Sequence, residues 1–453
     1  MSNKQPTHRR ITAAAPPRRR RTRWYTAGLA GLTGMASVAA FSGTATAAEA
    51  TGSTSTANPS STATTQGGNQ APVPCAADQL IAAIVRANAN GGAQLTLTPR
   101  CTYTLTTNQG ADGLPIITQP ITINGQDATI TRAASATNFR ILNVGVGGRL
   151  TLNNLTITGG FAPDSPGGGG ILVQAGGRAT LYDTTVTHNQ STTNGGGIAN
   201  YGIAAVLGDG HGGGKVANNS TPVSGGGIYN QGQLSTKDIE VSDNTSDIEG
   251  GGITDRGTAV LEQTRIVDNF ADSSGGGLTT VAAVTKLTAS TVSDNTADGD
   301  GGGIECVSST IYVSSTKVDH NTATDDGGGI FNQSVPAPLG GSAFAVVEDS
   351  EVDGNTASGD GGGINNGSAN LVVRRSHVSL NQAIGTASRG GGIFDFAGAL
   401  TLTAAEITEN SSAVAGGVFN STNRITVDQK SVIVANRPTN CTGSTVAVPN
   451  CFG

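Results

Sequence analysis

The chain has 453 residues, and its 67 glycines are about twice the usual share of roughly 7%. Only 4% of the residues are aromatic and 13% charged, which disfavours an ordinary α/β enzyme with an aromatic-rich core. The glycines follow no Gly-X-Y period, so collagen is excluded. With 36% hydrophobic residues and a formal net charge of −6, the composition also argues against a disordered chain.

Residues 1–47 have the pattern of a secretory signal peptide. Eight Lys and Arg residues and no acid lie between Lys4 and Arg23, an apolar stretch follows at about 25–41, and small residues lead to a cleavage site near Ala48. The apolar stretch is too short and too rich in Gly and Ala for the ~20 residues of a membrane span. We therefore expect export, by either the Sec or the twin-arginine route.

Cleavage changes the charge that the exported protein carries. The removed segment holds eight of the 26 Lys and Arg residues and none of the 32 acids, which leaves a formal charge of −14. A basic nucleic-acid interface is thereby disfavoured. Residues 48–72 are rich in Thr, Ser and Ala and predict a disordered linker. We expect a secreted monomer with no membrane span after signal cleavage.

Five cysteines fit an oxidising compartment. Cys75 and Cys101 bracket one short unit, and Cys441 and Cys451 bracket the C-terminal tail. We expect these two pairs to form disulfides that close local loops, the alternative being five free thiols. No Cys-x-x-Cys pair occurs, so a zinc site is disfavoured.

One motif recurs nine times between about 186 and 420. A β-branched residue is followed three places later by Asn, then by a glycine run and an aliphatic residue, as in Val186, Asn189, Gly195–Gly197 and Ile198. The nine asparagines are Asn189, Asn219, Asn244, Asn269, Asn295, Asn321, Asn355, Asn381 and Asn410.

The length of the repeat selects the fold. Successive aliphatic residues are mostly 25 or 26 residues apart, which is too short for a propeller blade, and the Thr, Val, Ile and Gly content does not suit a helical solenoid. About 25 residues fit one coil of a parallel β-helix, whose stacked coils share a core. We predict roughly a dozen coils, with a cap and the first coils at 73–160, the repeat array at 161–430 and a C-terminal cap at 431–453.

The repeat also predicts polar side chains inside the coils. Strand alternation turns the β-branched and aliphatic residues inward, and with them the residue two places after each aliphatic. We expect each ladder Asn to bond backbone across a turn and to stack on the next. Cys306 occupies the second polar position, which predicts a buried, structural thiol, with a functional thiol as the alternative.

A different unit precedes the repeats. Residues 76–90 place Leu80, Ile81, Ile84 and Val85 on one helical face, and a glycine pair follows. We predict a short N-terminal helix that caps the open end of the first coil. Strands are expected around Leu95 and Leu97, Tyr103 and Leu105, and Ile121 and Ile123.

The Gly-Gly-Gly-Ile and Val-x-x-Asn motifs resemble the GGAI and FxxN repeats of the chlamydial polymorphic membrane proteins, which are adhesins. More broadly, the chain resembles secreted bacterial right-handed parallel β-helix proteins with the pectate-lyase-like fold. The repeat covers about 260 residues. The chain departs from the chlamydial proteins in having Val or Ile where they have Phe, and we expect no C-terminal membrane barrel. The resemblance implies an all-β, right-handed, single-stranded parallel β-helix and a role in adhesion.

Several side chains are candidates for chemistry. Asp300, Asp326 and Asp360 each precede a glycine run, and carboxylates stacked on adjacent coils suggest a Ca²⁺ site, with solvated turn residues as the favoured alternative. His188 and His320 stand where other coils have Asp, which indicates an exposed turn position.

Arg374, Arg375 and His377 form the one basic cluster of the array, but the repeat spacing places no acid beside it. No catalytic residue and no cofactor is therefore assigned.

Three functions remain open. We expect a non-catalytic adhesion or extracellular polysaccharide-binding protein, because most coils are minimal and a repeating surface suits multivalent binding. The first alternative is a polysaccharide lyase or glycoside hydrolase, supported if the inserts at 202–218, 333–348 and 382–389 wall an acidic pocket. The second is a structural cell-surface spacer without a ligand.

Overall fold

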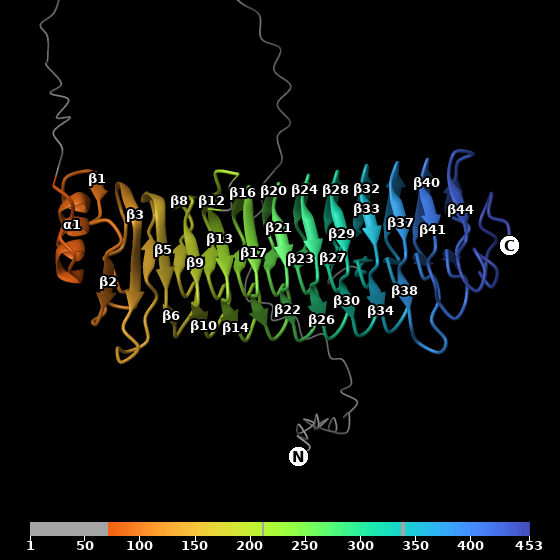
Figure 1. Ribbon diagram of the computed structural model, residues 1–453, viewed down its shortest axis with the longest axis horizontal. Coiled ribbons are helices and arrows are strands. Elements are labelled where there is room, and N and C mark those ends of the chain that lie inside the picture. The colour runs from red at the N-terminus through yellow and green to blue at the C-terminus, as the bar shows by residue number, and fades with distance from the viewer. Residues whose placement is uncertain (1–70, 211–212, 337–339) are drawn as a thin grey trace, which may run out of the picture. The chain divides into compact units, whose positions relative to one another are not determined.

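A computed structural model describes residues 71–210, 213–336 and 340–453. The predicted signal peptide at 1–47 lies outside the described residues, as does the predicted linker at 48–72 apart from its last two residues. The described chain is a parallel β-solenoid of about 13 turns, preceded by one helix, α1 (Ala77–Ala89). The coils stack in sequence order from α1 to β44 (Figure 1).

Three parallel sheets run along the solenoid. The first has 11 strands, which carry the aliphatic residue of each repeat: β4 (Leu142–Val144), β7 (Ile171–Val173), β11 (Ile198–Asn200), β15 (Ile228–Asn230), β19 (Ile253–Asp255), β23 (Leu278–Val281), β27 (Ile304–Val307), β31 (Ile330–Gln333), β35 (Ile364–Gly367), β39 (Ile393–Phe396) and β42 (Val418–Asn420).

The largest sheet has 24 strands and bends between two sets. The long strands open each pair: β8 (Arg178–Tyr182), β12 (Ile203–Leu207), β16 (Gln233–Lys237), β20 (Thr258–Glu262), β24 (Val284–Thr288), β28 (Thr310–Ser314), β32 (Phe344–Glu348), β36 (Asn370–Arg374), β40 (Ala399–Thr403) and β43 (Ile425–Val427). The short strands follow them: β9 (Thr185–Thr187), β13 (Gly214–Ala217), β17 (Ile239–Ser242), β21 (Arg265–Val267), β25 (Thr291–Ser293), β29 (Lys317–Asp319), β33 (Glu351–Asp353), β37 (His377–Ser379), β41 (Glu406–Thr408) and β44 (Val432–Val434).

The first coils differ from the rest. β3 (Pro120–Arg132) and β5 (Arg149–Thr158) run through both sets, and β1 (Ala93–Thr96) and β2 (Thr102–Leu105) pair with β3. A third sheet of two-residue strands closes the coil: β6 (Phe161–Ala162), β10 (Gln190–Ser191), β14 (Ser220–Thr221), β18 (Thr245–Ser246), β22 (Phe270–Ala271), β26 (Thr296–Ala297), β30 (Thr322–Ala323), β34 (Thr356–Ala357) and β38 (Gln382–Ala383).

The core consists of stacked equivalents from successive coils. Ile198 pairs in register with Ile228, and Val216 with Val241, and all four side chains are buried. The other β-branched and aliphatic residues of the repeat are buried in the same way. The predicted parallel β-solenoid is thus confirmed, and its core is built from Val, Ile and Leu rather than from aromatic rings.

The helix α1 covers the first coil, as the sequence predicts, but with a narrower apolar face. Leu80 and Ile84 are fully buried, together with Ala83. Val85 is 51% exposed, and its assignment to the buried face was wrong. At 3.6 residues per turn, positions 80, 83, 84 and 87 share one stripe, and position 85 lies to its side.

A column of buried asparagine side chains, the Asn ladder, runs the length of the array. In one rung, Nδ2 of Asn269 donates to Oδ1 of Asn295 at 3.0 Å and to the carbonyl oxygen of Val241 at 2.9 Å, and the Asn269 backbone N–H donates to the same Oδ1 at 3.0 Å. Each Oδ1 therefore accepts two bonds, and each amide nitrogen bonds two neighbours. The ladder comprises Asn189, Asn219, Asn244, Asn269, Asn295, Asn321, Asn355, Asn381, Asn410 and Asn436.

Each of the three glycines in a repeat is required for a different physical reason. Gly225 has φ +71°, a left-handed conformation that glycine adopts without strain. A Cβ on Gly226 would lie 2.4 Å from a carbonyl oxygen of the next coil. A Cβ on Gly227 would lie 2.9 Å from Nδ2 of Asn244. The glycine run therefore turns the chain, lets coils approach, and makes room for the Asn ladder.

The C-terminal tail ends the ladder. Asn436 was missed by the sequence pattern because no glycine run follows it, although Ile433 stands three places before it as in every repeat. Its Nδ2 and backbone N–H both donate to Oδ1 of Asn440, each at 3.1 Å. A disulfide joins Cys441 to Cys451 in the tail.

At the other end of the solenoid, a disulfide joins Cys75, just before α1, to Cys101, just before β2.

Asn295→Ala should strongly destabilise the protein. The change removes the hydrogen bonds of a fully buried amide, leaves the backbone N–H of Asn269 without its acceptor, and takes away one of the two bonds that Oδ1 of Asn321 accepts. We expect a loss of about 2–4 kcal/mol, measured as a shift of the urea unfolding midpoint by circular dichroism. Asn370→Ala on the outer face of β36 is the matched control. Equal midpoints for the two variants would contradict the role of the ladder.

Candidate functional site

A second polar row lies inside the coils, two residues after each aliphatic, and all its members are fully buried. Nδ2 of Asn366 donates to Oδ1 of Asp395 at 2.6 Å, whereas the other oxygen of Asp395 has no hydrogen-bond partner. Burial raises the pKa of Asp395 to about 6. The row consists of Asn200, Asn230, Asp255, Thr280, Cys306, Asn332, Asn366, Asp395 and Asn420.

Cys306 is the free cysteine of the described chain, and it is buried. Its Sγ donates to the carbonyl oxygen of Ser309 at 3.6 Å, and burial raises the pKa of the thiol to about 12. A thiol with so high a pKa carries almost no thiolate at neutral pH, and the thiolate is the reactive form. The position accords with a structural role.

The calcium candidates Asp300, Asp326 and Asp360 stand on successive coils, as the repeat predicts. Oδ1 of Asp300 accepts the backbone N–H of Asp326 at 3.1 Å, and Oδ1 of Asp326 accepts that of Asp360 at 2.7 Å. Arg389 ends the row with its Nη2 2.5 Å from Oδ2 of Asp360. Burial raises the pKa of Asp326 to about 6.

These carboxylates therefore bond backbone between coils. Among the described residues, no group of three or more His, Cys, Asp or Glu side chains is placed to hold a metal ion.

His188 and His320 occupy left-handed turn positions, with φ +52° and +54°. The equivalent Asp243, Asp268 and Asp294 have φ between +54° and +56°. Asp and His tolerate this conformation better than most residues, which explains the interchange.

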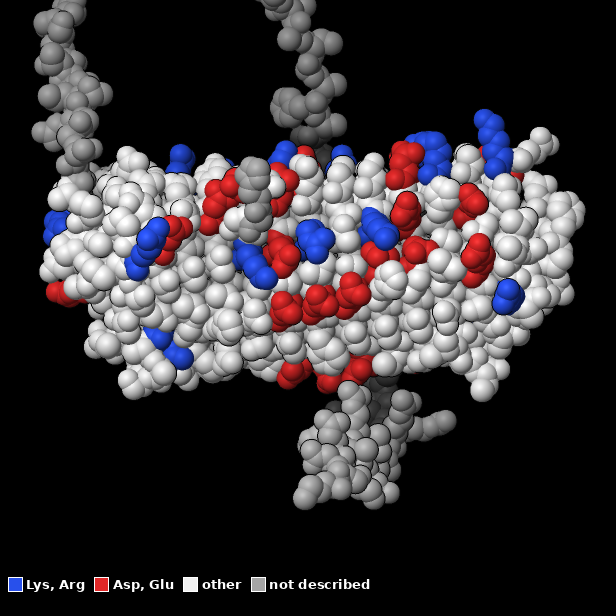
Figure 2. Space-filling model, viewed as in Figure 1, with Lys and Arg blue, Asp and Glu red and all other residues white. Residues whose placement is uncertain are grey.

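Figure 2 shows acidic side chains gathered in a line on the face that carries the short strands. Burial and the charges of Asp294 and Asp243 raise the pKa of Asp268.

The basic cluster is neutralised by acids at the equivalent positions of the neighbouring coils. Nη2 of Arg374 lies 2.8 Å from Oε2 of Glu348, and Nε of Arg375 lies 2.7 Å from Oδ1 of Asp349. His377 Nδ1 lies 3.0 Å from an oxygen of the next coil's Glu406. The prediction that the repeat spacing places no acid beside this cluster was wrong. Glu348 and Arg374 stand four places before the β-branched residues Val352 and Val378 of successive coils, and they pair in the sheet register.

The outer side of the 11-stranded sheet is buried, which the repeat pattern did not predict. Each strand turns its middle residue outward, but the glycine turn of the same coil lies over it: a Cβ on Gly301 would be 3.0 Å from Cβ of Glu305. All these residues are at most 8% exposed. This outer row consists of Leu172, Ala199, Tyr229, Thr254, Thr279, Glu305, Phe331, Asn365, Phe394 and Phe419.

Glu305 is the one carboxylate in the outer row. Its Oε2 accepts the hydroxyl of Thr279 at 3.1 Å. Burial, together with the charges of Glu249 and Asp300, raises the pKa of Glu305 to about 8, so it is mostly protonated at neutral pH. Glu249 pairs with Arg256, whose charge acts on Glu305 in the opposite sense.

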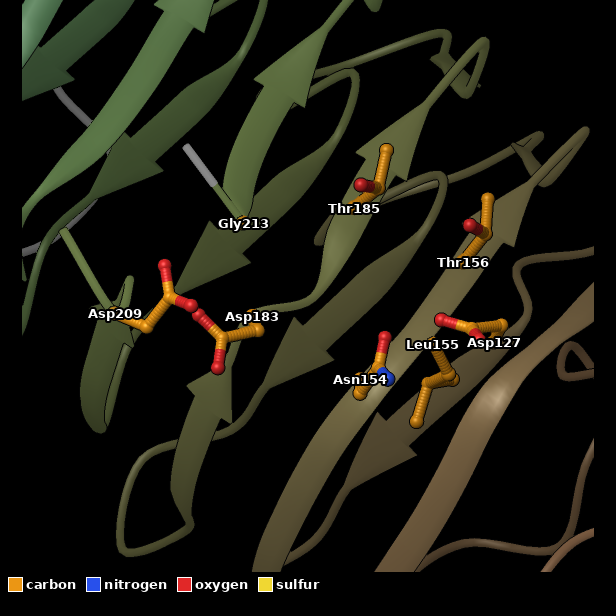
Figure 3. A pocket seen from close by; sticks show the side chains of 8 residues that line it. All are labelled: Asp127, Asn154, Leu155, Thr156, Asp183, Thr185, Asp209 and Gly213. Atoms are coloured by element: carbon orange, nitrogen blue, oxygen red, sulfur yellow. The ribbon is translucent and has the colours of Figure 1, made fainter. Parts of the chain in front are cut away.

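Two depressions flank the long strands near the N-terminal end. The acidic depression, of about 460 Å³, lies where the long strands end; in Figure 3 the side chains of Asp183 and Asp209 extend toward each other across it. Oδ1 of Asp183 is buried and has no hydrogen-bond partner. The depression is lined by Asp127, Asn154, Leu155, Thr156, Asp183, Thr185, Asp209 and Gly213.

The second depression, of about 430 Å³, lies where the same strands begin. No acid lines it, and two arginines, Arg149 and Arg178, stand in it beside Tyr201 and Gln233. We call it the basic depression. Its lining residues are Gly147, Gly148, Arg149, Gly176, Gly177, Arg178, Tyr201, Gly202, Ile203, Gly232 and Gln233.

The arginines of the basic depression were not singled out from the sequence. A signal exists, because Gly-Gly-Arg-x-Thr-Leu occurs at 147–152 and again at 176–181. These coils precede the nine regular copies of the repeat, and in them the repeat motif is weakest.

No protein-family model matches the chain, and no curated protein matches it. Among solved structures, the A-module of the mannuronan C-5 epimerase AlgE6 of Azotobacter vinelandii matches with 13% identity and a TM-score of 0.38, over 78% of this chain and 94% of that one. PfbA, a surface adhesin of Streptococcus pneumoniae, matches with 10% identity and a TM-score of 0.36, over 77% of this chain and 89% of that one. At these TM-scores neither similarity indicates a shared activity.

Within the described residues, no helix has the length and apolar character needed to cross a membrane.

Glu305→Gln should flatten the pH dependence of stability. The folded pKa of about 8 lies above the unfolded value near 4.5, so the unfolded state binds fewer protons between these pH values, and stability falls as pH rises. We expect the wild type to lose about 1 kcal/mol per pH unit from pH 6 to 8 through this group, and the variant not to. Urea unfolding midpoints measured from pH 6 to 8 test this expectation, with Glu351→Gln as the control because Glu351 is exposed. Parallel curves for wild type and Glu305→Gln would refute the burial effect.

The thiol of Cys306 should react with a disulfide reagent such as DTNB only when the protein unfolds, because the side chain is buried and protonated. We expect one equivalent to react in denaturant and almost none under native conditions. Cys306→Ala should show no reaction in either condition. Rapid labelling of the native protein would show an accessible thiol instead.

Proposed function

We propose that this protein is an extracellular, non-catalytic binding protein that attaches to a polysaccharide or cell-surface glycan through the outer face of its long strands. One observation carries the proposal. Val260, Val284 and Tyr312, on the adjacent strands β20, β24 and β28, are each 40–49% exposed. In the sheet register Lys286 pairs with Val260 on one side and with Tyr312 on the other. We call these four residues the apolar patch.

A sugar chain is a fitting occupant of this patch. Single exposed apolar side chains are common, but neighbouring ones on a flat sheet, rimmed by polar residues such as Thr258 and Thr310, are typical of interaction sites. Tyr312 offers an apolar ring face and a hydroxyl, which match the apolar faces and hydroxyl groups of a pyranose. Neighbouring coils lie about 4.8 Å apart, a repeat comparable to the length of a sugar unit. A polymer lying across the strands would gain from several weak contacts.

Location and family resemblance support the same function. Two disulfides fit an exported protein, as does the predicted signal peptide. The resemblance of the Gly-Gly-Gly-Ile and Val-x-x-Asn motifs to the repeats of polymorphic membrane proteins favours adhesion as the role of such binding.

A second candidate function is a polysaccharide lyase or glycoside hydrolase. It is favoured by Glu305, whose raised pKa is that of a general acid at neutral pH, and by the nearby pair of Glu249 and Arg256. Against it, Glu305 is only 8% exposed, which restricts contact with a substrate.

Binding should depend on the apolar patch. We expect the protein to be retained on at least one immobilised polysaccharide, and the double variant Val284→Ser with Tyr312→Ala to weaken retention by about tenfold, since each aromatic or aliphatic contact contributes of the order of 1 kcal/mol. Tyr182→Ala is the matched control, because Tyr182 is 43% exposed on β8, outside the patch.

The same polysaccharides should be assayed for turnover, with and without Ca²⁺. We expect no new reducing ends and no unsaturated ends. Products that disappear in Glu305→Gln would establish the second candidate instead, and failure to retain any glycan would refute the proposed function.

A further inference from the structure

Arg149 and Arg178 are neighbours in space with no acid between them. They open the adjacent strands β5 and β8, and the sheet register places them side by side. Both are exposed, and neither forms an ion pair or a side-chain hydrogen bond with another described residue. The flanking positions of the same row hold Pro120 and Ile203, which bring no negative charge.

This arrangement differs from that of other cations on the same sheet. Lys237 lies 2.9 Å from the cross-strand carboxylate of Glu262, and Arg374 lies 2.8 Å from that of Glu348. Like charges on neighbouring strands are destabilising, whereas opposite charges stabilise. In a chain with 32 acids, an unneutralised pair of adjacent arginines is therefore an exception to how the sheet places its charges.

The glycines beside the arginines are explained by the stacking of coils. A Cβ on Gly177 would lie 2.7 Å from the carbonyl oxygen of Val144, and a Cβ on Gly202 would lie 2.3 Å from that of Gly177. Stacking thus accounts for the hollow, but it makes no demand on the charge of the next residue. The arginines need a separate explanation.

Two polar side chains complete the basic depression. The hydroxyl of Tyr201 donates to the carbonyl oxygen of Pro166 at 2.8 Å, which fixes the ring at the edge of the hollow. Burial and the neighbouring Tyr229 raise the pKa of Tyr201 to about 12, so the ring stays neutral and adds no repulsion toward an anion. Gln233 on β16 pairs with Ile203 on β12, and its side-chain amide lines the depression.

We propose that the basic depression binds an acidic polysaccharide, with one carboxylate or sulfate group held between the guanidinium groups of Arg149 and Arg178. Guanidinium groups bind such anions with paired, charge-assisted hydrogen bonds. The sugar ring lies against Tyr201, and Gln233 bonds its hydroxyl groups. The volume of about 430 Å³ falls within the range of small-ligand sites, about 300–1,000 Å³. The inference rests on the proposed function and specifies the charge of the glycan.

The acidic depression at the other end of the same strands limits the directions in which a bound anionic polymer can extend. Asp183 and Asp209 repel an anionic chain there, so the polymer is expected to leave the basic depression across the long strands toward the apolar patch.

The test compares the full-length secreted protein with variants in affinity electrophoresis and calorimetry against three probes: polygalacturonate, dextran sulfate and neutral dextran. We expect binding of an anionic probe that weakens at least tenfold in Arg149→Gln with Arg178→Gln, because hydrogen bonds to charged groups are lost. The double variant Arg374→Gln with Arg375→Gln removes the same charge elsewhere and should bind within twofold of wild type. Arg149→Lys with Arg178→Lys should bind with intermediate affinity, since lysine keeps the charge but not the paired geometry.

The outcomes separate the inference from the proposed function. Preference for polygalacturonate or for dextran sulfate identifies the anionic group. Equal losses in the two glutamine double variants would show a general charge effect and overturn the site. Binding of neutral dextran alone, or anionic binding unaffected by the change at Arg149 and Arg178, would overturn the inference while the proposed function stands. Unchanged melting temperatures of these surface variants exclude misfolding as the cause.

Discussion

The buried amide of the ladder asparagine is the interaction on which the rest of the solenoid depends. An amide removed from water must find partners for its donors and its acceptor, and here it finds them in the same amide of the next coil and in backbone groups of the neighbouring coils. This requirement favours the register in which each ladder asparagine lies next to its equivalent in the following coil. It also explains the third glycine of each run, because no Cβ fits between that position and the amide of the next coil. The column ends where other groups take over, with the backbone N–H of Gly160 donating to Asn189 at one end and Asn440 accepting at the other.

The glycine turn has a second consequence on the outer side of the coil. It lies over the middle residue of each strand in the 11-stranded sheet, so positions that alternate outward are nevertheless shielded from water. Hydrophobic residues such as Phe394 suit this environment, and Arg389 packs over its ring at 4.6 Å. A charged carboxylate is unfavourable there, and burial therefore raises the pKa of Glu305.

The exposed and variable side chains lie on the outer faces of the long and short strands, where they are free of these constraints. The charges there are mostly paired between adjacent coils, as Lys237 and Glu262 are. The basic depression and the apolar patch are the two places that break this pattern. Both lie on the same set of strands, and the coil spacing offers a linear polymer repeated contacts at regular intervals. The scaffold thus separates a uniform interior, which holds the coils together, from an exterior whose side chains vary from coil to coil.

The sequence by itself determined the solenoid, its repeat and its inward-facing residues, because one unit of about 25 residues recurs and each inward position meets its own copy in the next coil. Asn189 and Ile198 could be placed from spacing alone for this reason. Only the tertiary structure decided which side chains are exposed and which charges meet. The burial of Glu305 depends on how a glycine turn folds over a strand, and the ion pair of Arg374 with Glu348 forms because equivalent positions of successive coils meet when the coils stack. The pair of Arg149 and Arg178 arises because residues 29 positions apart become neighbours when coils stack. A periodic sequence determines what lies inside each coil, but surface neighbours come from different coils and are brought together only by stacking and by the loops between strands.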